Sequence, residues 1–455
     1  MTPELTTVIV TGVFTILAGV VCWIVYWVKI GGYTKTLGPA RMDATEISLA
    51  SGEEPSAFRE SPSVGAQWLV LLVLVFGYAA SHLQRIALSL LAPVIQRDLG
   101  VSSVQLGLVF GASGLGFMAG YVLMTVVTAL CGTRWSLVAA FAGGSLAACA
   151  SGLFPTITGI IAARFLLGFF TGGLLPAAVQ SAREWFPSRL RPLVIGAILA
   201  AGPAASALVT PLVVFLSQAM GWRTVLIITG LPTAIAAVLC VVAWPSPPPR
   251  ETFRGISAAA WASTGMLALG LFFAAPVSYF VMSWLPMYLQ AGHNVDLAAA
   301  RNAITLLPVA GCVGALLAGA IAWAAAGTGT SSSKVRAAML TVCGCLLPLV
   351  ALSAFAQNWA IVIVLAALSA AAYQGWATLL YSAVADTFPA RGVAVAAAFG
   401  ALVLGLSGIA SPIAIGQMIS SSGYQPVLVM VAASALVALL AVGLLAWRVP
   451  QEPAG

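Results

Sequence analysis

Charged residues are scarce in this 455-residue chain: they make up 7% of it, against 61% for hydrophobic residues. Soluble domains carry about 25% charged residues and about 45–50% apolar ones. The shortage therefore excludes a soluble globular protein and a disordered chain. It also excludes a nucleic-acid binder, because 19 Lys and Arg residues spread over this length form no basic surface, despite a formal net charge of +7.

Motifs for metals, redox chemistry and nucleotides are missing as well. The seven cysteines lie in or beside apolar runs, and the nearest pair, Cys343 and Cys345, forms only C-x-C. No G-x-x-x-x-G-K-[ST] loop is present, so an ATP-driven pump would need another chain. No nucleophile or acid–base constellation supports an enzyme. We therefore expect no catalytic residue, no metal and no cofactor.

Long apolar runs dominate the chain instead. A membrane-spanning helix needs about 20 apolar residues. The runs and their breakers, such as Pro155, predict thirteen spanning helices in a lipid bilayer, at residues 7–28, 67–93, 104–128, 136–154, 156–180, 193–217, 223–244, 261–290, 300–326, 335–356, 359–385, 392–419 and 424–447. The first is not a signal peptide, because Glu4 precedes it and the positive charges follow it.

Polar segments divide these helices into domains. The prediction is an extra N-terminal transmembrane helix within residues 1–28, a cytoplasmic linker at 29–65 and an N-terminal six-helix bundle at 66–244. A central cytoplasmic loop follows at 245–260, then a C-terminal six-helix bundle at 261–448 and a cytoplasmic tail at 449–455. Six spans, a loop and six more spans suggest two bundles related as parallel repeats.

The distribution of Lys and Arg predicts the orientation. Placing the 29–65 linker in the cytoplasm puts 14 cations inside: Lys29, Lys35, Arg41, Arg59, Arg134, Arg183, Arg189, Arg191, Arg250, Arg254, Lys334, Arg336, Arg391 and Arg448. Three lie outside: Arg97, Arg223 and Arg301. The positive-inside rule therefore predicts an outer N-terminus and a cytoplasmic C-terminus in the cell inner membrane.

Three ionisable groups remain inside the predicted spans: His82, Arg85 and Arg164. No carboxylate shares the membrane with them, and an intramembrane charge costs at least about 2.5–3.5 kcal/mol. Either the two arginines face a water-filled cavity that attracts an anion, or they snorkel or bond to backbone carbonyls. His82 shares a helix face with Arg85. It is either a packing histidine or a group that contacts substrate or a proton.

Aromatic and amide side chains are candidates to complete an anion site. We predict that the substrate-binding residues are the two arginines and His82 together with Tyr121, Tyr373 and Gln374. Further candidates are Tyr279, Trp284, Trp376 and Tyr381. Each alone is equally compatible with packing between helices or with an interfacial anchor.

Four stretches of residues 66–448 resemble the anion:cation symporter branch of the major facilitator superfamily, which includes hexuronate, galactonate and sialin-like carriers. They are His82-Leu-Gln-Arg85 with Leu91-Ala-Pro-Val-Ile95; Arg164-Phe-Leu-Leu-Gly168 with Glu184-Trp-Phe-Pro187 and Gly221-Trp-Arg223; Trp284-Leu-Pro-Met-Tyr-Leu289; and Asp386-Thr-Phe-Pro-Ala-Arg-Gly392 with Ser411-Pro412. The resemblance implies an all-α membrane fold of 12 helices in two bundles, here with one extra N-terminal helix. It also implies that Arg85 stands at the position of the first-helix arginine of these carriers, and that Arg164 stands where their fourth-helix arginine engages the substrate carboxylate.

The departures from the branch concern coupling and gating. Gln84 stands where proton-coupled members have an acid before the first-helix arginine, and Thr171 stands where they have a fourth-helix acid. Ala129 replaces the aspartate of the loop after the second helix, and Ala200 and Gly405 replace polar residues. Carboxylate-mediated proton symport is therefore not expected, which leaves uniport, exchange or coupling through His82.

Two functions follow from these observations. The first is a secondary transporter of a small organic anion, a sugar acid or another carboxylate, that works by alternating access. The alternative is a transporter-derived subunit that no longer transports and docks a membrane-protein partner through residues 1–65. Retention of both arginines favours the first, and the decayed motifs favour the second.

Overall fold

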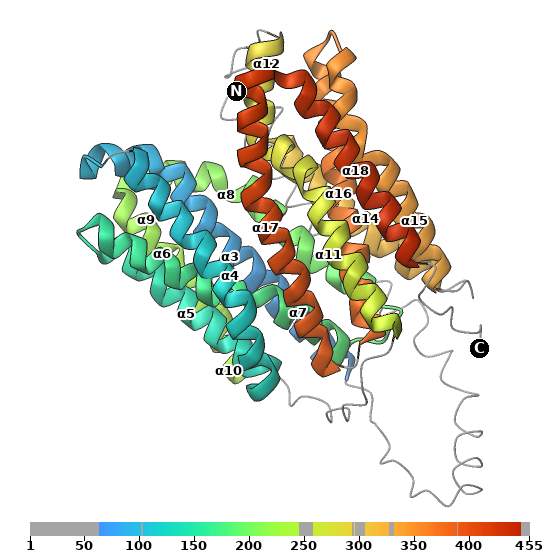
Figure 1. Cartoon of the computed structure of the whole chain (residues 1–455). Helices are drawn as coiled ribbons and strands as arrows, with labels where there is room; N and C mark the ends of the chain where they lie inside the picture. Colours follow the sequence, from blue (N-terminus) through green and yellow to red (C-terminus); the bar gives the residue numbers. More distant parts are fainter. Residues whose placement is uncertain are drawn as a thin grey trace, which may run out of the picture. The chain divides into compact units, whose positions relative to one another are not determined.

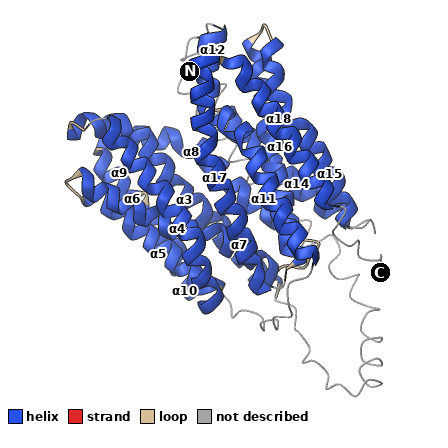
Figure 2. Cartoon of the chain, viewed as in Figure 1, coloured by secondary structure: helices blue, strands red, loops and turns tan. Residues whose placement is uncertain are grey.

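The computed structural model describes residues 63–101, 103–244, 258–293, 295, 305–326, 332–388 and 390–446. Short loops join helices throughout these ranges (Figure 2). Within these ranges, twelve stretches are long and apolar enough to cross a membrane. They match the twelve spans predicted between residues 67 and 447, whereas the helix predicted at 7–28 lies outside the described residues.

The first six spans form the N-terminal half, coloured blue to green in Figure 1. Helix α4 packs on α6, α5 packs on α6 and α10, and α3 packs on α8. Two spans are each made of two helices in succession. The elements are α3 (Val64–Leu99), α4 (Ser103–Cys131), α5 (Thr133–Leu153), α6 (Ile157–Gly172), α7 (Leu174–Trp185), α8 (Arg191–Met220), α9 (Trp222–Ile228) and α10 (Gly230–Val242).

The last six spans form the C-terminal half, yellow to red in Figure 1. Helix α11 packs on α16, α17 and α18, and α14 packs on α16. Two spans contain a stretch with different helical winding, named η1 and η3. The elements are α11 (Ala258–Tyr279), η1 (Phe280–Trp284), α12 (Leu285–His293), α14 (Leu306–Ala325), α15 (Ser332–Leu346), η3 (Leu347–Phe355), α16 (Trp359–Thr387), α17 (Ala390–Ser422) and α18 (Tyr424–Ala446).

Side-chain caps and glycine turns set several helix boundaries. The hydroxyl of Thr156 accepts a hydrogen bond from the Gly159 amide at the start of α6, and Asn358 accepts from the Ala360 amide at the start of α16. Each bond satisfies a backbone donor that the first helical turn leaves free. Between α8 and α9, Gly221 has a φ of 78°, a backbone conformation that glycine adopts without a side-chain clash.

Helices α4 and α6 approach each other backbone to backbone. A Cβ on Gly116 would lie 2.0 Å from the Phe165 carbonyl oxygen, and one on Gly120 would lie 2.1 Å from that of Phe169. On the facing helix, a Cβ on Gly168 would lie 2.1 Å from the carbonyl oxygen of Ser113. Only glycine permits this separation, and small residues at helix interfaces favour such contacts in membranes.

The two halves meet along specific helix pairs. Helix α8 of the first half packs on α14 and α16 of the second, while α17 packs on α4 and α7. The α8–α14 contact is close, because a Cβ on Gly196 would lie 2.6 Å from the Ala315 carbonyl oxygen and one on Gly319 would lie 2.6 Å from that of Pro192. The close contacts at Pro192 and Gly196 lie in the first two turns of α8, so the two halves approach each other near the end of the spans where α8 begins.

Candidate functional site

Arg85 is the partly exposed cation of the mid-span region. Helix α3 positions it, and its guanidinium carbon lies 4.7 Å from the centre of the Phe117 ring on α4. Such a cation–π contact holds the group without neutralising its charge. Among the described residues no hydrogen bond or ion pair engages Arg85. The guanidinium therefore keeps its donors for another partner.

Aromatic rings of the N-terminal half surround Arg85. Tyr78 and His82 lie one turn apart on α3, with ring centres 4.9 Å apart, and Phe117 and Tyr121 on α4 have ring centres 5.8 Å apart. Phe117 is close both to Arg85 and to Tyr121, and His82 lies three residues before Arg85 on the same helix. The predicted site residues His82, Arg85 and Tyr121 are thus brought together.

His82 and Gln374 both pack on neighbouring helices. A Cβ on Gly202 of α8 would lie 2.6 Å from the His82 ring, so the imidazole lies against the α8 backbone. Gln374 on α16 places its Cγ 3.1 Å from the position of a Cβ on Gly311 of α14. Its stem therefore contributes to the α14–α16 contact.

Three tyrosines of the C-terminal half are further members of the candidate site. Tyr279 of α11 lies against α17, because a Cβ on Gly408 would lie 2.3 Å from its hydroxyl oxygen, and Tyr373 lies on α16. Tyr381, also on α16, is 2% exposed, and its hydroxyl has no hydrogen-bond partner among the described residues. We call Arg85, Phe117 and these tyrosines (Tyr78, Tyr121, Tyr279, Tyr373 and Tyr381) the central cluster.

Arg164 is placed differently from Arg85. Its side chain is 1% exposed, and Nη1 donates to the backbone carbonyl of Gln84 at 3.0 Å. Its Nε has no hydrogen-bond partner among the described residues. This placement corresponds to the backbone-bonded alternative left open by the sequence.

Neutral groups fill the positions of the two missing acids. Gln84 is fully buried and donates through Nε2 to the Thr233 hydroxyl at 2.6 Å and toward the Thr229 carbonyl at 3.4 Å. Thr171 donates to the Leu167 carbonyl of its own helix. A carboxylate has no proton to donate to the Thr229 carbonyl, so this arrangement suits an amide.

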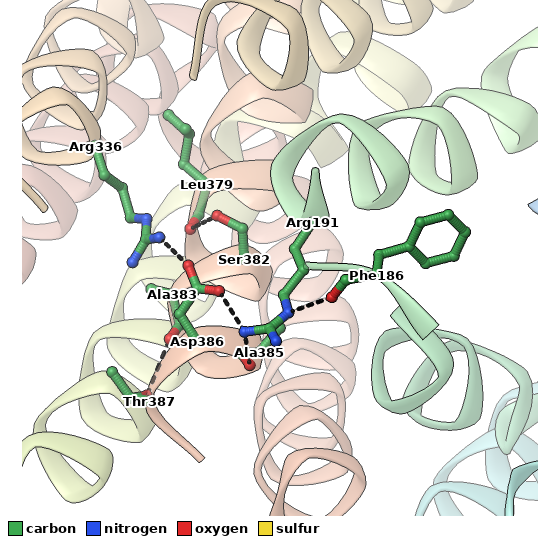
Figure 3. Close-up of polar contacts among 9 residues, drawn as sticks. All are labelled: Phe186, Arg191, Arg336, Leu379, Ser382, Ala383, Ala385, Asp386 and Thr387. Carbon is green, nitrogen blue, oxygen red and sulfur yellow. Dashed lines mark hydrogen bonds and ion pairs between the residues drawn. The ribbon is translucent and has the colours of Figure 1, made fainter. Parts of the chain in front are cut away.

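Three charged residues, which we call the ionic latch, join the two halves at the end of the spans where α8 begins (Figure 3). Arg191 of α8 donates to Asp386 of α16 at 3.0 Å, and Arg336 of α15 donates to the other oxygen of the same carboxylate. Arg191 also donates to the Phe186 carbonyl of its own half and to the Ala385 carbonyl across the interface. A single carboxylate therefore links three helices.

Sequence reasoning missed parts of both features. Tyr78 and Phe117 precede His82 and Tyr121 by four residues, a spacing that places each pair on one helix face and that could have identified them. The latch also has a signal in the sequence. The acid-x-Phe-Pro-x-Arg pattern occurs twice, as 184–189 and as 386–391, at the same place in each half.

Among the described residues, twelve helices that could span a membrane form two halves, and one span carries the partly exposed Arg85; this arrangement is typical of a multi-pass membrane transport protein. The sequence model of the Major Facilitator Superfamily matches residues 74–331, so the chain belongs to that family. This confirms the fold class and family predicted above. It also means that the protein is a transporter and not an enzyme.

Relatives and a solved structure agree with this assignment. The chain is 25% identical to the probable galactarate/D-glucarate transporter GudP of Bacillus subtilis, over 82% of this chain and 90% of the relative. It is 23% identical to the D-galactonate transporter of Escherichia coli, over 82% and 94%. The outward conformation of the transporter FucP matches with a TM-score of 0.65 and 14% identity, over 85% of this chain and all of that one (100%).

Proposed function

We propose that the chain is a secondary transporter that moves a small organic anion, a sugar acid or a related carboxylate, by alternating access. The observation that carries this proposal is Arg85, a cation inside a membrane span whose guanidinium contacts the Phe117 ring and has no hydrogen-bond or ion-pair partner among the described residues. A guanidinium can bind a carboxylate through two parallel hydrogen bonds, which fixes both position and orientation. Tyr121 and Tyr373 contact the substrate from opposite halves, so that binding can bias the relative motion of the halves.

Coupling to protons through a membrane carboxylate is not part of the proposal. The carboxylates of the described residues are Asp98, Glu184 and Asp386, and all three lie at helix ends. Each accepts a hydrogen bond there, from Trp222, Thr133 and Arg191 respectively, among others. The mechanisms left are uniport, exchange, or proton coupling in which His82 binds and releases the proton.

The proposed location is the cytoplasmic membrane, with the ionic latch on the cytoplasmic side. The excess of Lys and Arg in the loops at that end supports this orientation. It puts the N-terminus outside and the C-terminus in the cytoplasm. In the conformation seen here, the latch then closes the cytoplasmic end of the interface.

A non-transporting role has no observation in its favour, since the relatives are transporters over most of their length. Docking of a membrane-protein partner through residues 1–65 stays a prediction that is independent of transport. Co-purification of a partner with the full chain, and its loss when residues 1–62 are deleted, tests it.

Uptake by proteoliposomes tests the transport proposal. We expect saturable uptake or counterflow of a labelled six-carbon sugar acid by the purified chain, loss in Arg85→Ala and partial retention in Arg85→Lys. The charge-matched control is Arg134→Gln, because Arg134 donates to the carbonyls of Cys240 and Val241 at a helix end. Uptake that survives in Arg85→Ala, or a folded chain that transports none of these acids, contradicts the proposal.

A further inference from the structure

Two fixed positive charges lie inside the spans of the N-terminal half. Arg85 of the central cluster is partly exposed and lies 4.7 Å from the centre of the Phe117 ring. Arg164 is 1% exposed; its Nη1 donates to the Gln84 carbonyl, and its Nε has no hydrogen-bond partner among the described residues. A guanidinium keeps its charge at neutral pH. Since no described carboxylate pairs with either arginine, this region carries positive charge without a counter-ion of its own.

Neutral side chains occupy the space beside Arg164. The position of a Cβ on Gly144 of α5 is 3.7 Å from Gln84 Oε1 and 3.1 Å from the Thr171 methyl group, so these two side chains meet at one point of α5. Gln84 donates to the Thr233 hydroxyl, and Thr171 donates to the Leu167 carbonyl. Neither an amide nor a hydroxyl becomes negatively charged at neutral pH. These positions therefore cannot neutralise the arginines at any stage of a transport cycle.

The titratable groups nearby do not neutralise them either. His82 lies three residues before Arg85 on α3, and an imidazole is either neutral or positive. A proton bound by His82 would therefore add to the uncompensated charge. The carboxylates of Asp98 and Glu184 are held at the ends of the spans by hydrogen bonds from Trp222 and Thr133. A negative charge beside Arg85 has to come from a bound solute.

Alternating access changes the surroundings of Arg85. Its contact Phe117 precedes Met118 in α4, and the Cγ of Met118 lies 3.6 Å from the position of a Cβ on Gly405 of α17, in the other half. The guanidinium is thus held next to the interface between the halves. To expose a site to alternate sides, the two halves pass through a state closed to both sides. In that state an unpaired guanidinium loses water without replacement, which is strongly disfavoured, whereas a bound anion supplies a counter-charge and two hydrogen-bond acceptors.

We infer that the chain is an obligatory exchanger, in which the inward movement of one organic anion requires the outward movement of another. The loaded protein changes between its two sides, and the empty protein does not. The argument depends on the sum of the charges and holds whichever arginine contacts the substrate carboxylate. This inference rests on the proposed transport function. It goes beyond that function because it selects exchange over uniport and proton coupling, and because it identifies the return substrate as an anion.

Efflux from proteoliposomes of the full chain tests the inference. The vesicles are loaded with labelled D-galactonate and diluted into buffer with or without unlabelled D-galactonate; D-galacturonate and galactarate are used in parallel. Potassium and valinomycin on both sides hold the membrane potential at zero, because the charge left behind by a departing anion would otherwise stop net efflux. We expect efflux to be at least about tenfold faster when the external buffer contains the acid, since only then does the protein return loaded.

An added counter-ion tests the physical cause. Gln84→Glu places a carboxylate near the Arg164 contact, and efflux into acid-free buffer is expected to rise to within about threefold of the exchange rate. Gln84→Asn is the neutral control and is expected to keep the dependence on external acid. Thr171→Glu places the charge at the same point of α5 and serves as a second variant if Gln84→Glu does not fold. Equal dependence on external acid in the folded acidic variant and in Gln84→Asn overturns the role of the uncompensated charge.

The outcomes distinguish the inference from the proposed function. Wild-type efflux that is equally fast with and without external acid overturns exchange and leaves the transport function intact. Acid-free efflux that is driven by a pH difference across the membrane also overturns exchange, in favour of proton coupling through His82. Absence of exchange with all three acids, in protein shown to be folded, contradicts the transport function itself.

Discussion

Replacement of Asp386 by Asn is expected to loosen the interface between the two halves at the ionic latch. Asn keeps the size of the side chain but removes the negative charge that Arg191 and Arg336 share. Two guanidinium groups are then left close together without a counter-ion. Of the two ion pairs lost, only that with Arg191 crosses between the halves, because Arg336 lies in the same half as Asp386.

The magnitude follows from the burial of the latch. The side chains of Arg191, Arg336 and Asp386 are 9%, 12% and 16% exposed, which places the pair between a surface ion pair and a buried one. Surface pairs contribute about 0.2–1 kcal/mol, and hydrogen bonds to charged groups about 1.5–3 kcal/mol. Arg191 keeps its bond to the Phe186 carbonyl. We therefore expect the contact between the halves to weaken by about 1–2 kcal/mol, which is about a 5- to 30-fold change in equilibrium.

Hydrogen–deuterium exchange of the protein in lipid nanodiscs measures this change. Faster exchange is expected in Asp386→Asn and in Arg191→Gln, in peptides covering residues 180–190 and 383–388. Asp98→Asn is the matched control, because Asp98 accepts from Trp222 within the N-terminal half. If the latch variants exchange no faster than Asp98→Asn, the latch does not hold the halves together and the reasoning is refuted.

Three further predictions concern the spans themselves. Gly314→Ala is expected to lower the melting temperature, because its Cβ would lie 2.0 Å from the Ala371 carbonyl oxygen and such overpacking costs about 1–3 kcal/mol. The control Gly111→Ala is expected to leave the melting temperature unchanged, because no atom lies within 4 Å of the added Cβ. Gln84→Glu is expected to make uptake respond to an imposed proton gradient, unlike the wild type, because it places an ionisable group beside the Arg164 contact; an identical response of both proteins contradicts this. Arg164→Gln is expected to lower thermal stability while changing the KM by less than about twofold, since one backbone hydrogen bond is lost; a KM increase as large as that of Arg85→Ala contradicts the placement of Arg164.

The twelve described spans could be predicted because a bilayer requires long apolar helices, and most of this sequence consists of long apolar runs. The irregularities inside the spans could not. The division of one span at Gly173, the altered winding at Phe280–Trp284 and the 3₁₀ stretch Leu347–Phe355 depend on how neighbouring helices pack. Hydropathy averages over such features, so it reports the span and not its internal geometry.

The candidate site was predictable in type and only partly in geometry. A mid-span arginine such as Arg85 can be identified from sequence because the membrane makes any charge conspicuous. The same signal identified Arg164, but whether a side chain faces the interface or the interior of its own half depends on the rotation of the helix. For the latch, the sequence places Arg191 and Asp386 at helix ends but does not show which charges pair across 195 positions.

The backbone contact between α4 and α6 has a consequence for the mechanics of transport. At Gly116, Gly120 and Gly168 the backbones of the two helices touch directly, so no side chain at these positions can slide or change rotamer. We therefore expect the pair to move as one rigid element, with the displacement that exposes a substrate to alternate sides taking place at other contacts. Helix α4 also contacts α17 of the other half. We therefore expect α4 and α6 to move together relative to α17 when the two halves change their relative position.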